Sequence, residues 1–334
     1  MASESRFANR LLGSGRSSVP ATPKGIRGAV ITGWASALPP NIVTNDDLSK
    51  TLDTSDEWIR ERSGIGERHI GGTTAELSIQ SASAALKMAG LDPLQIDALV
   101  LSTTTPDRCV PATSATVQHA LGLKCGAFDV NAACSGFVYS LTIAHGLIAM
   151  GANKVLVIGT DTLSRITDWN DRNTAVLFAD GSGAVVLEAV DGPGQMLAWD
   201  IDADGSAEEA LYAELGGFIK MEGKEVFRRA VRIMVDSAQK SLTAAGLTSE
   251  DIDVVIPHQA NIRIIQAACE RLSIPIEKAA TVLHFTGNTS SASIPLALVH
   301  AADTGLLKKG DTVLLVGFGA GMTAASAIIT WEGR

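Results

Sequence analysis

Cysteine and net positive charge are both scarce in this sequence. The four cysteines are Cys109, Cys125, Cys134 and Cys269. They form no CxxC pair and no Cys/His spacing of a metal site, which argues against disulfides or structural zinc and favours a reducing compartment, so we expect a cytoplasmic protein. The net charge of −9 lacks the basic field that nucleic acid or an anionic membrane attracts, so an acidic partner would need a local basic patch.

Uncharged runs long enough to span a membrane are also nearly absent. One such run covers residues 131–153, where a span needs about 20 residues. Serine, threonine and glycine interrupt it, so we expect a buried core helix and no membrane partner. The first 27 residues are rich in serine and basic residues but have no apolar secretory core. We expect residues 1–27 to be a flexible N-terminal extension; a transit-like leader is the alternative.

Apolar strand-like runs alternate with longer helical patterns along the rest of the chain. The runs GAVITGWAS at 28–36, IDALVLSTT at 96–104 and NKVLVIGTD at 153–161 are typical of buried strands, and residues 74–88 have the pattern of a helix. This alternation predicts an α/β fold with largely parallel strands. The 32 glycines are typical of α/β enzymes whose helices and strands pack closely.

An internal repeat is the most informative pattern. The segment AGLDPLQIDALVLSTT, from Ala89, is echoed by AGLTSEDIDVVIPHQ, from Ala245, 156 residues later. MGANKVLVIG is echoed by KKGDTVLLVG at an offset of 158. Two segments that repeat at nearly one offset indicate a duplicated βα half-domain. We therefore predict an N-terminal half over 28–190 and a C-terminal half over 191–334.

The repeat brings three reactive side chains toward one edge of the fold. Shifting Cys134 by the offset leads into the loop that contains Asn288, so both loops should be equivalent strand-to-helix turns, and His258 ends a neighbouring strand. Cys134 lies at a predicted helix N-terminus, where the helix dipole lowers a thiol pKa and favours the nucleophilic thiolate. Taken singly, each residue also fits a structural role, as a core cysteine, a structural histidine or a turn asparagine.

Several motifs occur in a fixed order along the chain. They are DTSDEWIRERSGI, AACSGF, TDWNDR followed by FADGSGA, PHQANIRI and GNTSSASIP. Together they resemble β-ketoacyl-acyl carrier protein synthase III, a condensing enzyme of the thiolase superfamily, from about Gly28 to Arg334. The resemblance implies a thiolase-like, five-layered αβαβα duplicated α/β fold and a homodimer. It also implies that no metal or redox cofactor is needed.

The activity that the resemblance implies is acyl transfer with carbon–carbon bond formation. An acyl-coenzyme A primer acylates Cys134, and decarboxylative Claisen condensation with malonyl-acyl carrier protein starts fatty acid biosynthesis. His258 and Asn288 match the two groups that bind the malonyl thioester carbonyl, where neutral donors stabilise an enolate without quenching it. The backbone N–H groups of Cys134 and Ala320 match the oxyanion hole. Relatives often carry glycine where Ala320 stands, which matters if that position needs positive φ.

Further positions match substrate contacts of the family. Trp58, Arg62 and Arg172 match contacts to the coenzyme A adenine and phosphates, with a solvated helix face as the alternative. Asn261 matches a residue that lines the pantetheine channel.

Three more positions concern the carrier protein and the primer. Arg228 and Arg263 match basic residues that receive the acidic acyl carrier protein, although Glu270 stands where relatives often have lysine. Val110 stands where acetyl-preferring relatives carry a phenylalanine supplied across the dimer interface. We therefore expect longer or branched primers to be accepted; ordinary interface packing is the alternative.

Two other functions stay open at this point. A polyketide-pathway priming ketosynthase or acyltransferase of the same superfamily would carry the same motifs. A non-catalytic subunit that only binds acyl thioesters is a third reading, against which the intact Cys134 argues.

Overall fold

The computed structural model describes residues 27–333, so the predicted N-terminal extension lies outside the described residues apart from Arg27. Two larger sheets form the body of the molecule. The first has the strand order β1 (Gly28–Ala37), β7 (Asp180–Val190), β6 (Lys154–Thr162), β4 (Ala98–Ser102) and β5 (Gly126–Val130). The second has the order β11 (Val254–Pro257), β12 (Thr312–Gly319), β13 (Thr323–Thr330) and β8 (Met196–Asp202).

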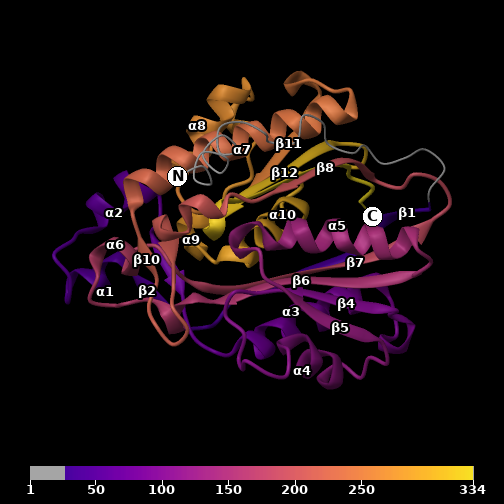
Figure 1. Ribbon diagram of the computed structural model, residues 1–334, viewed down its shortest axis with the longest axis horizontal. Coiled ribbons are helices and arrows are strands. Elements are labelled where there is room, and N and C mark those ends of the chain that lie inside the picture. The colour runs from indigo at the N-terminus through magenta and orange to yellow at the C-terminus, as the bar shows by residue number, and fades with distance from the viewer. Residues whose placement is uncertain (1–26, 334) are drawn as a thin grey trace, which may run out of the picture.

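Helices separate and cover these sheets, which gives five layers (Figure 1). The middle layer holds α5 (Gly136–Ala149) and α10 (Ser293–Asp303). The outer face of the first sheet is covered by α3 (Thr74–Ala89) and α4 (Thr113–Ala120), and that of the second by α7 (Gly223–Ala245) and α8 (Ile262–Leu272). The predicted αβαβα arrangement is confirmed.

The uncharged run around residue 140 forms α5, the buried core helix that we expected. Its buried side chains include Phe137, Leu141, Ala144 and Ile148, which recur at helical spacing and pack into the core between the sheets. Among the described residues, no helix has the length and apolar character that crossing a bilayer requires.

The repeat that the sequence predicts is present in atomic detail. Gly90 and Gly246 end α3 and α7 in the same left-handed conformation, with φ of 71° in both. Asp97 accepts the backbone N–H of Lys154 at 3.0 Å, and Asp253 accepts that of Thr312 at 2.9 Å. Each carboxylate therefore fastens the start of one strand to the start of its parallel neighbour.

The expectation of largely parallel strands is wrong. β4 runs parallel to β5 and β6, and β11 runs parallel to β12, whereas β7 is antiparallel to β1 and β6, and β13 is antiparallel to β12 and β8. Apolar runs report only that both faces of a strand are covered, which the helix layers impose in either direction. Direction depends on the connection: the turn of residues 320–322 between β12 and β13 is too short for a parallel crossover.

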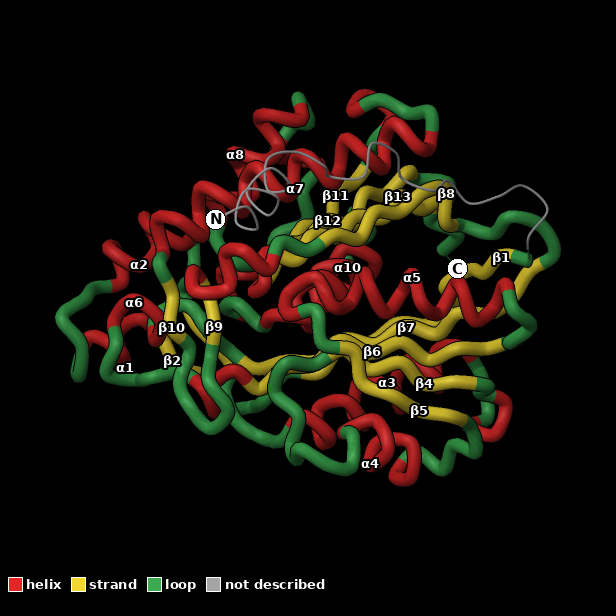
Figure 2. The backbone as a smooth tube through the Cα atoms, viewed as in Figure 1, coloured by secondary structure: helices red, strands yellow, loops and turns green. Residues whose placement is uncertain are grey.

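Smaller elements gather at one end of the layers, on the left in Figure 2. Strand β6 ends at this side of the molecule, and the segment that leads into the loop before α10 lies there too. These elements are β2 (Ile42–Thr44), β3 (Glu67–His69), β9 (Leu211–Tyr212), β10 (Lys220–Met221), α1 (Asn45–Ser49), α2 (Asp56–Ser63), α6 (Arg172–Ala175) and α9 (Leu283–Thr286).

Candidate functional site

Cys134 lies in a tight 3₁₀ turn, Ala133–Ser135, that joins β5 to α5. Ala133 has φ of 46°, a left-handed conformation that costs a non-glycine residue on the order of 1–3 kcal/mol. In the other half, the turn before α10 contains Ser290 with φ of 50°. The two loops are therefore equivalent left-handed turns that lead into α5 and α10, as the repeat predicted, although the second follows the short helix α9 (Leu283–Thr286) and not a strand.

Strand β12 brings Cys134 and His258 to the same place. A Cβ atom on Gly319 would lie 2.6 Å from the backbone nitrogen of Cys134, so only glycine permits this approach. A Cβ atom on Gly317 would lie 3.5 Å from the carbonyl oxygen of Cys134 and 3.6 Å from Cβ of His258. Both residues thus pack against one short stretch of strand.

Burial controls the protonation of Cys134, the predicted nucleophile. Cys134 is 9% exposed, and desolvation raises the pKa of its thiol to about 12; the hydroxyl of Ser290 lowers that pKa in part, and the charge of Asp161 raises it further. The expectation that a helix N-terminus lowers this pKa is not met, because loss of solvent acts more strongly on the buried thiolate. The thiol is protonated at neutral pH.

His258 is buried at the end of β11, with 1% of its surface exposed. Its backbone N–H donates to the carbonyl oxygen of Val316 at 2.8 Å, and its ring meets Phe318 edge-on with centroids 5.4 Å apart. Nδ1 lies 2.6 Å from Oγ of Ser293. Nε2 is buried with no hydrogen-bond partner among the described residues. Burial lowers the pKa of His258 to about 3, so the ring is neutral.

Asn288 is held from both sides by a segment of the first half. Its backbone N–H donates to Leu177 at 2.9 Å, and its carbonyl oxygen accepts from the N–H of Ala179 at 2.9 Å. Oδ1 accepts the N–H of Ser290 at 3.0 Å, which leaves the Nδ2 amide group as the donating end. Gly287 has φ of 70°, and a Cβ there would lie 2.8 Å from Cβ of Ala179. Glycine is therefore needed before this asparagine.

Sequence reasoning missed Asp161, a buried carboxylate at the end of β6. Oδ1 accepts hydrogen bonds from the threonines at 103–105, including the N–H of Thr104 at 2.7 Å. Oδ2 accepts the N–H of Ser291 at 3.0 Å and its hydroxyl at 2.7 Å. Asp161 therefore ties the loop after β4 to the turn that carries Asn288. The signal was an acidic residue ending an otherwise apolar strand.

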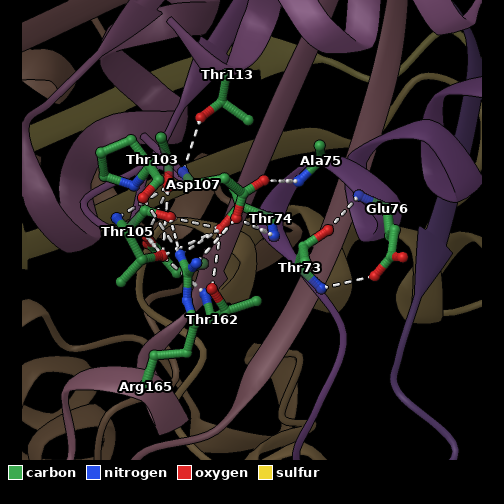
Figure 3. A network of polar contacts seen from close by, with 12 residues as sticks. Thr73, Thr74, Ala75, Glu76, Thr103, Thr105, Asp107, Thr113, Thr162 and Arg165 are labelled. Carbon is green, nitrogen blue, oxygen red and sulfur yellow. Dashed lines mark hydrogen bonds and ion pairs between the residues drawn. The ribbon is translucent and has the colours of Figure 1, made fainter. Parts of the chain in front are cut away.

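The same threonine loop continues into a polar network at the start of α3 (Figure 3). Asp107 accepts the N–H groups of Thr74 at 3.0 Å and Ala75 at 2.8 Å, and Arg165 pairs with it at 2.9 Å. The N–H of Asp107 also donates to the Thr113 hydroxyl at 3.3 Å. Both ends of the 107–113 loop, which carries Val110, are thereby anchored.

Val110 and Ala320 stand in contrasting environments. Val110 is 81% exposed, so within one chain it closes no buried pocket. Ala320 follows Gly319, the residue that approaches the Cys134 nitrogen. The left-handed residues of this turn are Gly321 and Met322, with φ of 69° and 44°. Ala320 itself needs no positive φ, so its side chain does not prevent its N–H from serving an oxyanion hole.

Trp58, Arg62 and Arg172 form a stack on the surface. The guanidinium carbons of Arg62 and Arg172 lie 4.6 Å and 4.8 Å from the centroid of the Trp58 ring. Arg172 also donates to the carbonyl oxygen of Asp53 at 2.7 Å. Asn261 caps α8 and donates to the carbonyl oxygen of Arg62 at 2.8 Å. These four predicted residues are therefore brought together on the surface.

The predicted basic residues lie on two helices that pack together, Arg228 on α7 and Arg263 at the start of α8. The Arg263 guanidinium lies 5.6 Å from the ring centroid of Phe227, the residue that precedes Arg228. Arg228 is exposed and pairs with Glu225 at 2.8 Å, and Glu270 on α8 is also exposed. Acidic neighbours therefore reduce the positive charge of this surface.

Comparison with known proteins gives one consistent family. The family described as "3-Oxoacyl-[acyl-carrier-protein (ACP)] synthase III" matches residues 128–205, and the family described as its C terminal matches residues 242–331. Beta-ketoacyl-[acyl-carrier-protein] synthase III of Roseiflexus castenholzii is 47% identical, with 91% of this chain and 98% of the relative covered.

Solved structures agree with the sequence relatives. The crystal structure of 3-oxoacyl-[acyl-carrier-protein] synthase III from Aquifex aeolicus VF5 has a TM-score of 0.89 and 45% identity, covering 91% of this chain and 100% of that one. The priming β-ketosynthase of the R1128 polyketide biosynthetic pathway has a TM-score of 0.87 and 34% identity, covering 96% of this chain and 100% of that one.

Proposed function

The chain belongs to the β-ketoacyl-[acyl-carrier-protein] synthase III family, and on that premise we propose how its buried residues divide the reaction. The protein is an acyltransferase with a thiolase-like fold that condenses an acyl primer with malonyl-acyl carrier protein in fatty acid biosynthesis. One arrangement carries the proposed division: Cys134 and His258 pack against the same stretch of β12, and within residues 27–333 Nε2 of His258 has no hydrogen-bond partner.

In the first half-reaction, the sulfur of Cys134 attacks the thioester carbonyl of acyl-coenzyme A. The backbone N–H groups of Cys134 and Ala320 stabilise the oxyanion. The carbon–sulfur bond to coenzyme A breaks, and the proton from the Cys134 thiol ends on the departing coenzyme A sulfur. The thioester exchange needs no net gain or loss of protons.

In the second half-reaction, His258 and Asn288 donate to the malonyl thioester carbonyl. Carbon dioxide leaves, and the electron pair of the broken bond forms an enolate, whose oxygen the two neutral donors stabilise. The enolate carbon attacks the acyl group on Cys134, and collapse of the adduct releases the Cys134 sulfur, which takes up a proton. Because the carbanion comes from decarboxylation, we propose that no metal or redox cofactor takes part.

Partners follow from the surfaces already described. We propose that coenzyme A binds at the Trp58 stack with Asn261 beside it, since a guanidinium and an indole suit an adenine ring and phosphates. Arg228 and Arg263 are proposed to receive acyl carrier protein. We further propose that the protein works in the cytoplasm.

A homodimer is proposed on the open edge of the first sheet. Strand β5 pairs only with β4 in the described residues, and an unpaired edge is a template for a second strand. Phe128 on that strand is 38% exposed, and Val110 is exposed on the anchored loop. A two-fold partner that paired β5 with β5 would cover both.

The proposed chemistry is tested in two steps on the full chain. Incubation with acetyl-coenzyme A followed by mass spectrometry should place an acetyl group on Cys134. Addition of malonyl-acyl carrier protein should then yield the β-ketoacyl product. The Cys134→Ala variant should accept no acyl group, with Cys109→Ala as the control that still does. A wild type that is acylated yet forms no carbon–carbon bond would indicate an acyl-binding or acyl-transfer role instead.

A second candidate is priming of a polyketide pathway. Its support is the likeness to the R1128 priming β-ketosynthase together with Val110 in place of a bulky aromatic residue. Presenting the enzyme with malonyl groups on the carrier proteins of both pathways separates the candidates. A preference in kcat/KM for the polyketide carrier would favour the second.

A further inference from the structure

Ser293 makes a direct contact with the buried histidine from the middle helix layer. It is the first residue of α10, it is 0% exposed, and its hydroxyl oxygen lies 2.6 Å from Nδ1 of His258. The two residues are 35 positions apart: His258 follows the end of β11, and Ser293 begins α10. Within residues 27–333, this is the only hydrogen bond that the Ser293 hydroxyl makes.

The direction of that bond follows from what each atom needs. If Nδ1 carried the proton and donated it, the buried Ser293 hydroxyl would keep a proton with no acceptor, which is unfavourable in a protein interior. If the hydroxyl donates, Nδ1 is satisfied as an acceptor and the ring's single proton lies on Nε2. The second arrangement satisfies both partners.

The chemical type of the partner decides what the ring can do. A carboxylate at Nδ1 would stabilise an imidazolium and make Nε2 a base, as in hydrolytic triads. A hydroxyl that donates to Nδ1 does the reverse, because it favours the neutral ring and occupies the only lone pair left. Nε2 is then a hydrogen-bond donor and has no lone pair with which to take the Cys134 proton.

We propose that Ser293 is a positioning residue that donates to Nδ1 and holds His258 as the Nε2–H tautomer, so that the ring donates to the malonyl enolate oxygen and does not act as a base toward Cys134. This inference rests on the proposed division of the two half-reactions. Without the Ser293 hydroxyl, the two neutral tautomers of His258 become nearly equal in free energy. The tautomer protonated on Nδ1 presents the lone pair of Nε2 to the enolate oxygen.

The test uses the full chain with three substitutions. Ser293→Ala removes the hydroxyl, and Ser293→Thr keeps it. Ser140→Ala is the matched control, because Ser140 is also buried in the middle layer and its hydroxyl has no partner among the described residues. Each variant is assayed for acetylation of Cys134 by acetyl-coenzyme A and, separately, for carbon dioxide release from malonyl-acyl carrier protein.

Ser293→Ala should slow carbon dioxide release by roughly 10-fold or more, part of the loss expected on removing a donor, while acetylation changes by less than about twofold. Ser293→Thr should recover most of the decarboxylation rate, and Ser140→Ala should match wild type. Equal losses in both half-reactions for Ser293→Ala would overturn the proposal.

A second readout does not depend on activity. Nitrogen-15 NMR of histidine-labelled wild type, with the His258 signals assigned by their absence in His258→Gln, should show a protonated Nε2 and an acceptor Nδ1. A wild-type ring protonated on Nδ1 would overturn the proposal even if Ser293→Ala failed to fold. A correct tautomer in an enzyme that forms no condensation product would leave the Ser293 assignment standing and reject the proposed function.

Discussion

Ala133 and Ser290 adopt the same left-handed backbone conformation, with φ of 46° and 50°, each one residue before the centre of its turn. The residue that follows is Cys134 in one half and Ser291 in the other. Cys134 supplies the proposed nucleophilic sulfur, whereas Ser291 donates its hydroxyl to Asp161 and to the carbonyl oxygen of Ser102. The duplicated turn thus carries the proposed nucleophile in one half and a structural anchor in the other.

The buried state of Cys134 predicts a distinctive pH dependence of its alkylation. Because burial raises the pKa of the thiol to about 12, the thiolate fraction should rise about tenfold for each pH unit across pH 7 to 10. Iodoacetamide labelling, with each cysteine followed by peptide mass spectrometry, measures the rate. A plateau beginning near pH 7 would mean that the helix dipole outweighs desolvation.

Asp161→Asn should lower stability and activate the thiol together. An amide cannot accept from all the donors that the carboxylate binds, so the free energy of unfolding should fall by on the order of 3 kcal/mol. Loss of the negative charge should also lower the pKa of Cys134, so alkylation at a fixed pH should be faster. Urea denaturation and labelling measure the two effects. Asp92→Asn, at a surface cap where asparagine serves about as well as aspartate, should cost less than about 0.5 kcal/mol and leave labelling unchanged.

His258→Ala and Asn288→Ala should separate the half-reactions. Each variant loses one donor to the enolate oxygen, so decarboxylation should fall by roughly 10²-fold or more. Acylation of Cys134 should persist, because the backbone N–H groups of the oxyanion hole remain. Acylation rates that fell in step with decarboxylation would make His258 chiefly a base for Cys134.

Val110→Phe should shift primer choice toward acetyl. An aromatic ring contributed by a two-fold partner would fill space in the acyl pocket, and each methylene that can no longer be buried is worth about 0.8 kcal/mol. Values of kcat/KM for acetyl, isobutyryl, hexanoyl and octanoyl primers in both proteins test this. A wild type confined to acetyl, or a variant with an unchanged profile, would reject the role of Val110.

Acid should destabilise the protein through His258. Burial lowers the pKa of this group from 6.5 to about 3, so below pH 6.5 the unfolded chain binds a proton that the folded chain excludes. The contribution of neutral His258 to the free energy of unfolding is fully present above pH 6.5 and is lost as pH falls toward 3. At pH 5 the loss from this group is about 2 kcal/mol. Urea denaturation at pH 7 and pH 5 should show that His258→Gln reduces this loss. His119→Gln, at an exposed position, should not reduce it.

The sequence by itself determined the duplication, whereas the layer order and the roles predicted for Cys134, His258 and Asn288 came from the family resemblance of its motifs. The duplication rests on local and periodic signals: the glycine that ends α3 recurs at the end of α7, and Asp97 recurs as Asp253 with the same hydrogen-bonding role. The order of the motifs and the repeat pointed to Cys134, His258 and Asn288 together, since each residue taken singly also fits a structural role.

Only the tertiary structure decided strand direction, the protonation of Cys134 and the partners of His258. Apolar runs do not record direction, and a thiol's pKa depends on how completely distant segments exclude water from it. Ser291 meets Asp161 across 130 residues, and Ser293 meets His258 across 35. The first bond joins the two halves and the second joins two segments of the C-terminal half, and no local sequence pattern encodes either contact.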